Sequence, residues 1–157
     1  MVVVARGAGR MPVVVVLAVG GVFLQAVGHG WAAVGVLDLV DERLAHGRDV
    51  PGADLVRGFM RAWIGVAGGM FLIGVCALMR FAWARIAVVV VECVLGLMFL
   101  VPLGYLVLLA PLLGADLLAD VLGFSAWNVT ALVLGLVLAV AIGRAMFSAA
   151  ALAWFTR

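Results

Sequence analysis

The sequence predicts an all-α fold, a four-helix transmembrane bundle whose two termini both lie on the cytoplasmic side. Three observations support this prediction: an apolar composition, four long apolar segments, and the positions of the arginine and tryptophan residues. Of the 157 residues, 68% are hydrophobic and only 11% are charged, whereas soluble domains are about 45–50% apolar. The composition therefore indicates a multi-pass protein of a cell membrane, and the lipid bilayer is its first expected partner.

The apolar segments define one transmembrane domain, 1–157. A helix needs about 20 residues to cross a hydrocarbon core about 30 Å thick. The segments of sufficient length run from about 11 to 37, 58 to 79, 86 to 109 and 127 to 150. Outer loops 38–57 and 110–126 and a cytoplasmic hairpin, 80–85, are expected to join them. Leu37, Val40 and Leu44 are at helical spacing, which also allows the first helix to continue beyond the membrane surface.

The charged residues orient the bundle, because cytoplasmic flanks carry an excess of positive charge. All ten basic residues are arginine, which together with the alanine, valine and glycine content favours a bacterial source. On the predicted cytoplasmic side stand Arg6, Arg10, Arg80, Arg85 and Arg157, whereas seven of the eight acids fall in the two opposite loops, with Asp116 and Asp120 in the second. On that opposite side Arg43, Arg48, Arg57 and Arg61 reduce the asymmetry.

The tryptophan positions support the four predicted spans, and the N-terminal residues raise the question whether the first span is retained. The tryptophans, Trp31, Trp63, Trp83, Trp127 and Trp154, all fall near predicted helix ends, where an amphipathic indole is favoured. Arg6 and Arg10 before an apolar run also fit a cleaved signal peptide. The apolar stretch continues through WAAVGVLDLV, which favours a retained membrane helix.

Small residues predict which helix faces meet. In lipid, helices associate through close packing of glycine and other small residues. The sequence places Gly21, Gly28 and Gly35 on one face of the first helix, with Gln25 and Ala32 between them, and a Gly65-x-x-x-Gly69 pattern on the second, while Gly96 follows Glu92 on the third and Gly135 shares a face with Asn128 on the fourth. We expect these faces to turn toward one another and to enclose the polar residues that they carry.

A polar pocket is a first candidate site. Counted from the helix ends at about 1.5 Å per residue, several polar residues fall in the outer half of the membrane: Gln25, His29, Arg61, Tyr105 and Asn128, with Arg57 at the rim. They form either a site for an anionic or polar ligand, such as a lipid headgroup, or hydrogen bonds between helices.

Glu92 is a second candidate, because it stands in the middle of the apolar segment 84–101. A charge at this depth costs about 2.5 kcal/mol or more, so the carboxyl should find a cation or be protonated. Arg85, seven residues earlier, and Arg80 are the expected cations, since Arg144 falls on another face of its helix. Three roles stay open: a structural link to the cytoplasmic hairpin, a contact to a partner subunit, or a proton site coupled to transport.

The middle of the chain is similar to a known group of proteins. The segment LMRFAWARIAVVV, residues 78 to 90, resembles the short arginine-containing turn of small actinobacterial four-helix integral membrane proteins. The resemblance covers mainly residues 58–100 and implies the topology. No activity is assigned to that group, so no site residue carries over from it.

The sequence contains no pattern typical of an enzyme, a metal site or a nucleic-acid-binding protein. No nucleophile stands near a base, no phosphate-binding glycine loop follows a strand, and no metal-ligand cluster occurs; we expect no enzyme activity and no cofactor. Cys76 and Cys93 are expected to be small packing residues. A dispersed net charge of +2 argues against nucleic acid.

Three functions remain after these exclusions. The leading interpretation is an accessory or scaffolding subunit, or a homo-oligomer, that works through helix contacts with itself or with another membrane protein. A small transporter or lipid-binding protein that uses the polar pocket, with Glu92 as proton site, is the alternative. A membrane sensor with an acidic outer loop is a third hypothesis.

Overall fold

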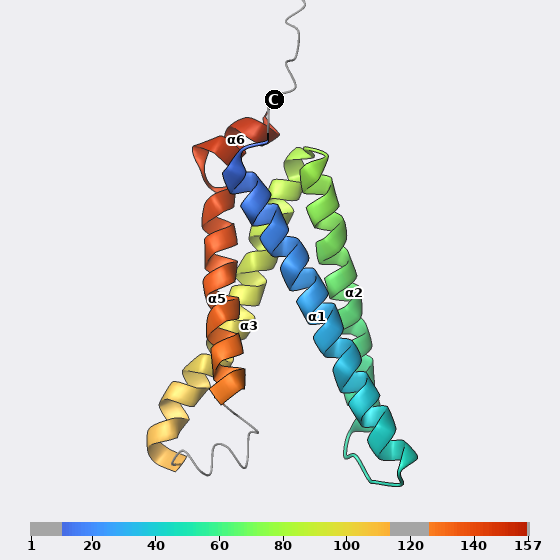
Figure 1. Cartoon of the computed structure of the whole chain (residues 1–157). Coiled ribbons are helices and arrows are strands. Elements are labelled where there is room, and N and C mark those ends of the chain that lie inside the picture. Colours follow the sequence, from blue (N-terminus) through green and yellow to red (C-terminus); the bar gives the residue numbers. More distant parts are fainter. Residues whose placement is uncertain (1–10, 114–125, 157) are drawn as a thin grey trace, which may run out of the picture.

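The structure is a computed structural model that describes residues 11–113 and 126–156. Over these residues the chain forms five helices and no strand. The helices are α1 (Val13–Ala45), α2 (Ala53–Leu78), α3 (Ala82–Leu113), α5 (Ala126–Met146) and α6 (Ala149–Phe155) (Figure 1). Several residues on which the predicted topology depends lie outside the described residues: Arg6, Arg10, Asp116, Asp120 and Arg157.

Four of these helices are long and apolar enough to cross a membrane. The candidate spans are Val13–Ala45, Ala53–Leu78, Ala82–Val101 and Val129–Met146. This confirms the prediction of an all-α chain with four long apolar helices, which has the character of a multi-pass membrane protein. Large apolar side chains on the outer faces agree with a lipid environment: Leu17 is 70% exposed and Ile86 is 66% exposed, and such faces are rare in water-soluble monomers.

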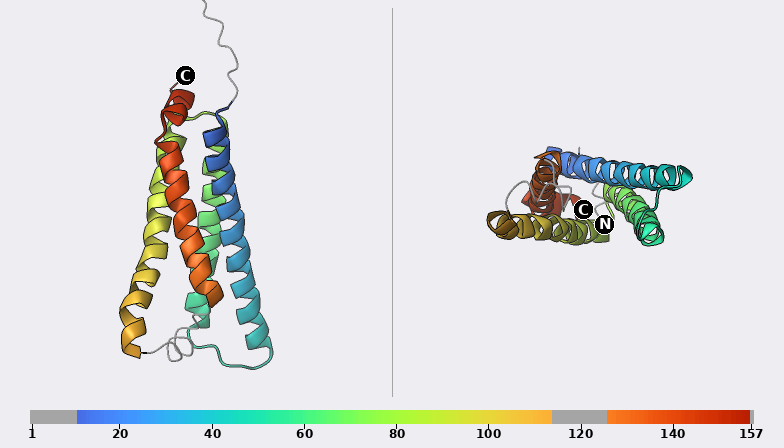
Figure 2. Two further views of the ribbon diagram at one scale, coloured as in Figure 1. Left: turned by 60° about the vertical axis from the view of Figure 1, so that its left-hand side comes forward. Right: turned by 90° about the horizontal axis from the view of Figure 1, so that it is seen from below.

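The long helices form two antiparallel pairs. α1 packs along α2, and α3 packs along α5, while smaller contacts of α1 with α5 and of α2 with α3 join the pairs. The pairs meet at the end that carries the start of α1, the α2–α3 turn and α6, which we call the terminal end. They diverge toward the opposite end, the far end, which carries the α1–α2 connection (Figure 1 and Figure 2). Side chains at the same face of one helix therefore meet different surroundings along its length.

α1 extends beyond the expected membrane segment. It has 33 residues, about 50 Å at the rise of an α-helix, and continues to Ala45 because Leu37, Val40 and Leu44 maintain an apolar face. Val40 is buried. The connection to α2 is accordingly short, residues 46–52, and much of the predicted outer loop is helical.

At the far end, α1 ends in a C-cap motif that favours glycine. The amide of Arg48 donates to the carbonyl of Arg43, and the amide of Gly47 donates to the carbonyl of Leu44. These two bonds make a Schellman motif, in which the residue after the C-cap adopts positive φ. Gly47 fills this position with φ of +68°, which costs a glycine little because it has no Cβ.

The same motif ends α2 at the terminal end, but an arginine occupies the glycine position. The amide of Phe81 donates to the carbonyl of Cys76, and the amide of Arg80 donates to that of Ala77. Arg80 has φ of +64°. A side chain in this region costs about 1 kcal/mol or more, so the contacts of the Arg80 side chain must compensate for it.

The fourth span is followed by a separate short helix. α5 ends at Met146, before the expected end near residue 150, and the chain turns at Ser148. Ser148 is the N-cap of α6, since its Oγ accepts a hydrogen bond of 3.2 Å from the amide of Ala151. Ala151 and Phe155 are buried, and α6 lies across the terminal end of the bundle (Figure 1).

Candidate functional site

The most deeply buried polar groups of the described residues are Gln25 on α1 and Glu92 on α3. Gln25 is 7% exposed and Glu92 is 3% exposed. Nε2 of Gln25 donates a hydrogen bond to Oε2 of Glu92 over 3.2 Å. Both residues lie about the same distance from the terminal end, since Gln25 is twelve residues into α1 and Glu92 is ten residues into α3. Gln25 therefore lies level with Glu92, nearer the terminal end than the far end of α1, whereas the sequence predicted it in the outer half of the membrane.

The pair is only half satisfied by this bond. Oε1 of Gln25 and Oε1 of Glu92 are both buried without a hydrogen-bond partner. No cation is within ion-pair distance of Glu92 in the part of the chain that the structure describes. A neutral carboxyl has an O–H donor, and an amide has both a donor and an acceptor, so an acid and an amide can make two reciprocal hydrogen bonds. In this structure the pair makes one of these two bonds, and one oxygen of each side chain is left without a partner.

Arg85 and Arg80 do not bind Glu92, which corrects the expected pairing. Nε of Arg85 donates to the carbonyl of Met146 over 2.8 Å. Nε and Nη2 of Arg80 donate to the carbonyl of Trp154 over 3.3 and 3.1 Å, and the guanidinium lies 4.3 Å from the centre of the Trp154 ring. The last carbonyls of a helix lack partners within the helix and attract cations. The two arginines therefore cap the C-terminal ends of α5 and α6 instead of reaching a carboxyl deep in the bundle.

Arg57 and Arg61, the two arginines of the expected outer polar pocket, do not converge on Gln25. Nε of Arg57 donates to Oδ1 of Asp41 over 2.8 Å, and the same arginine lies 3.8 Å from Asp54. Arg61 is exposed. The side chains of Tyr105 and Asn128 lie outside the described residues.

His29 has an aromatic environment in place of a ligand site. Its ring is half-buried, 5.5 Å from the ring of Trp63 and 6.0 Å from the ring of Phe99, measured between centroids. These rings come from α2 and α3, so His29 joins three helices. No group of three or more potential metal ligands occurs among residues 11–113 and 126–156.

The glycines divide into packed and unpacked positions. A Cβ on Gly21 would stand 2.7 Å from Ile142, one on Gly135 would stand 2.8 Å from Phe99, and one on Gly96 would be in contact with Leu136 at 4.0 Å. These three glycines lie at helix contacts, as predicted. A fourth close contact, between Gly74 and the ring of Phe23 at 2.8 Å, was missed, because Gly74 stands outside the Gly65-x-x-x-Gly69 pattern.

The remaining glycines of the predicted faces have no close neighbour on another helix among residues 11–113 and 126–156. A Cβ would find nothing within 4 Å at any of Gly28, Gly35, Gly65 and Gly69. The prediction that they pack inside the bundle is therefore wrong. On α1 the reason is the divergence of the helix pairs: Gly28 is seven residues from Gly21, on nearly the same face, but α5 covers this face only near the terminal end.

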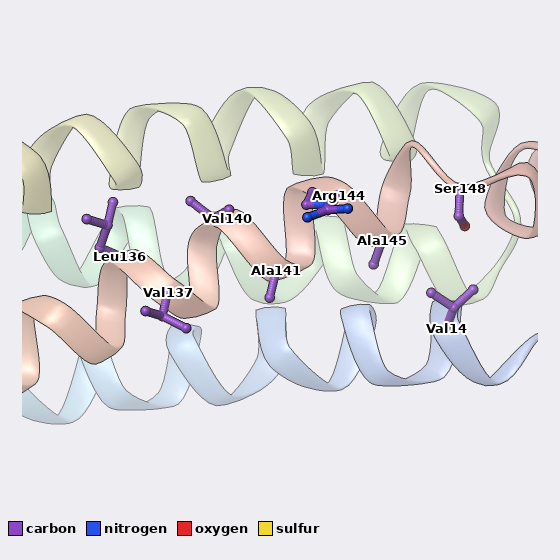
Figure 3. Close-up of a pocket in the computed structure, with 8 residues that line it drawn as sticks. All are labelled: Val14, Leu136, Val137, Val140, Ala141, Arg144, Ala145 and Ser148. Carbon is purple, nitrogen blue, oxygen red and sulfur yellow. The ribbon is translucent and has the colours of Figure 1, made fainter.

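Two apolar grooves flank α5 and both reach Arg144. One, of about 740 Å³, lies toward α1 and is lined by Val14, Leu136, Val137, Val140, Ala141, Arg144, Ala145 and Ser148 (Figure 3). The other, of about 520 Å³, lies between α3 and α5, and its lining includes Glu92, Cys93, Gly143 and Arg144. Cys93 is exposed, which corrects its assignment to the packed interior. The grooves share the ridge formed by Leu136, Val140 and Arg144.

Comparison with known proteins assigns no relative to the chain. No family model, no curated protein and no solved structure matches it.

Proposed function

We propose that this protein is a small multi-pass membrane protein that works through helix contacts, as an accessory or scaffolding subunit or as a homo-oligomer. One observation supports this best: the small-residue face of α1 is buried at Gly21 but uncovered from Gly28 to Gly35. Gly28, Ala32 and Gly35 are all exposed. We call this segment the α1 glycine face.

The α1 glycine face has the composition of a helix interface, but no described residue would contact a Cβ at Gly28 or Gly35. Small residues let two helix backbones approach closely, which is the main source of attraction between helices in lipid. At Gly21 this attraction is realised, because α5 fills the space with Ile142 and Leu138. The proposal assigns the equivalent space beside Gly28 and Gly35 to a helix of a second membrane protein or of another copy of this chain.

The proposed topology places both termini in the cytoplasm of a bacterial cell. Arg80, Arg85 and Arg144 stand near the terminal end, whereas the arginines near the far end, Arg43, Arg48, Arg57 and Arg61, are accompanied by the acids Asp38, Asp41, Glu42, Asp49 and Asp54. The proposal therefore rests on an excess of positive charge at the terminal end, which is usual for a cytoplasmic side. The orientation can be tested with a variant in which Cys76 and Cys93 are replaced and the exposed Asp49 is changed to cysteine. Labelling of whole cells by a membrane-impermeant maleimide is expected, whereas labelling only after lysis would reverse the topology.

Crosslinking in native membranes tests the helix-contact function. With a photoreactive residue at Gly28, we expect a specific adduct, either a dimer of this chain or a complex with one partner. The matched control is Gly20, which is also exposed and surrounded by open space but lies on another face of α1. Gly28→Leu together with Gly35→Leu should abolish the complex. A strictly monomeric particle after gentle solubilisation, with no adduct from position 28, would refute the proposal.

A second candidate function is a small transporter in which Glu92 is the proton site. It is favoured by the buried carboxyl with one unpartnered oxygen at the edge of the α3–α5 groove. In reconstituted vesicles Glu92→Gln should abolish a pH-driven proton flux. Glu42→Gln, which changes an exposed glutamate, should not. A flux that survives Glu92→Gln excludes this role.

A further inference from the structure

The chemistry of the α3–α5 groove is that of an amphiphile site. Its lining is almost wholly apolar over the α3 residues from Val89 to Leu100, about 17 Å along the helix. Gly96 and Gly143 contribute no side chain, and a Cβ on Gly143 would meet nothing within 4 Å. The groove is therefore open to a slender apolar chain, and a side chain at 143 would start in open space beside it.

One cation stands at the terminal end of this groove. Arg144 lies in the last turn of α5, is exposed, and makes no ion pair or side-chain hydrogen bond with any other described residue. An arginine in this position can extend toward the membrane surface while its stem stays in the apolar layer. Its planar guanidinium matches a phosphate, to which it can donate two parallel hydrogen bonds.

The geometry points to a binding site for an anionic phospholipid, with the phosphate at Arg144 and an acyl chain in the α3–α5 groove. The α1–α5 groove reaches the same guanidinium from the other side of the ridge, so the second acyl chain of one lipid has an apolar path beside it (Figure 3). We infer an anionic headgroup because Arg144 is positively charged. We infer an apolar tail because the lining of the groove is apolar.

Lipid retention by the purified full-length chain tests this site. The protein in a mild detergent is titrated with phosphatidylglycerol or with phosphatidylcholine of the same acyl chains, and the bound lipid is counted by native mass spectrometry. We expect phosphatidylglycerol to bind more tightly. Arg144→Gln should weaken its binding roughly fivefold, the effect expected for one interfacial cation, and should weaken phosphatidylcholine less, because the choline group compensates the charge of its phosphate.

Two further variants separate the headgroup from the chain and guard against misfolding. Gly143→Leu fills the groove but keeps the cation, so it should weaken both lipids alike. Arg144→Lys keeps the positive charge but loses the two parallel hydrogen bonds, so it should retain only part of the preference. Equal helicity by circular dichroism confirms that each variant is folded.

The control variants match the test positions. Arg43 is an exposed arginine in the last turn of α1, at the far end, and Arg43→Gln should not change the binding. Gly20→Leu adds the same side chain as Gly143→Leu, but at an exposed position outside both grooves. Equal affinity for the two lipids, or an equal loss with Arg43→Gln, would overturn the site. Neither result bears on the α1 glycine face, which is tested by crosslinking.

Discussion

Gln25 of α1 and Glu92 of α3 share a hydrogen bond of 3.2 Å, although each of the two helices packs mainly against a different neighbour. The bond thus joins the two antiparallel pairs at a level where they begin to diverge. Its partners are almost fully buried, so neither has water to replace the other.

Replacing one partner of this pair should lower the free energy of unfolding more than replacing both partners. Gln25→Leu leaves the Glu92 carboxyl buried without a donor, and we expect the free energy of unfolding to fall by about 1–3 kcal/mol. The double variant with Glu92→Leu leaves no unsatisfied group and should recover part of the loss. Unfolding in detergent titrated with sodium dodecyl sulfate measures all three. Strict additivity of the single losses would contradict the coupling.

This pair also shows how far the sequence could predict the structure. Hydropathy predicts the four long helices, because it depends only on local composition. Gln25 was assigned to an outer pocket because depth was counted along a first span assumed to end at residue 37, whereas α1 continues to Ala45 and Gln25 pairs with Glu92. The pairing of Gln25 with Glu92 depends on the rotation and tilt of two helices, which composition does not determine.

α6 and the unpacked glycines were missed for related reasons. Residues 149–155 are as apolar as the span before them, so hydropathy merged them with α5; Ser148, a good N-cap residue, was the available signal. The glycine spacing correctly gives one face of α1. It does not reveal that α5 moves away from this face beyond Gly21.

Gly74 and Gly68 on α2 should respond differently to the same substitution. A Cβ at Gly74 would stand 2.8–3.3 Å from atoms of the Phe23 ring, whereas one at Gly68 meets nothing within 4 Å. Phe23 is held in turn by the ring of Phe71, 4.9 Å away. Gly74→Ala should therefore destabilise the protein by about 1–2 kcal/mol, and Gly68→Ala should not. The same detergent titration measures the free energy of unfolding of both variants. Equal losses for Gly74→Ala and Gly68→Ala would contradict the close contact at Gly74.

Relief of the close contact provides a second check. Phe23→Leu removes the ring that a methyl group at position 74 would meet. In this background Gly74→Ala should cost less than in the original chain. If Gly74→Ala destabilises the Phe23→Leu variant as much as the original chain, the destabilisation does not come from the contact with the Phe23 ring.

Two substitutions of Arg80 should distinguish the effect of its positive φ from the effect of its side-chain contacts. Arg80→Ala and Arg80→Gly both remove the contacts with Trp154, so hydrogen exchange at the amides of α6 should accelerate in both. Because Arg80 has φ of +64°, the glycine variant should be more stable than the alanine variant by about 1 kcal/mol. Hydrogen exchange followed by mass spectrometry measures the first effect and detergent unfolding the second. Unchanged exchange in α6 would show that Arg80 does not hold it.

The ion pair at the far end should contribute little. Asp41 and Arg57 have 59% and 30% of their side-chain surface exposed, and exposed pairs are worth about 0.2–1 kcal/mol. Asp41→Asn should lower the free energy of unfolding by no more than this, and high salt should reduce the difference. Asp38→Asn, an exposed acid on the same helix, is the control. A larger loss that persists in salt would indicate a further partner for Asp41.

The contact of Arg80 with Trp154 also has a consequence for biosynthesis. The two residues are 74 positions apart, so the ribosome delivers the turn between the middle helices long before its fastening partner. Until Trp154 has been synthesised, the contacts that accompany the positive φ of Arg80 cannot form. The final geometry of the turn between α2 and α3 is therefore expected to be reached only after α6 has been made.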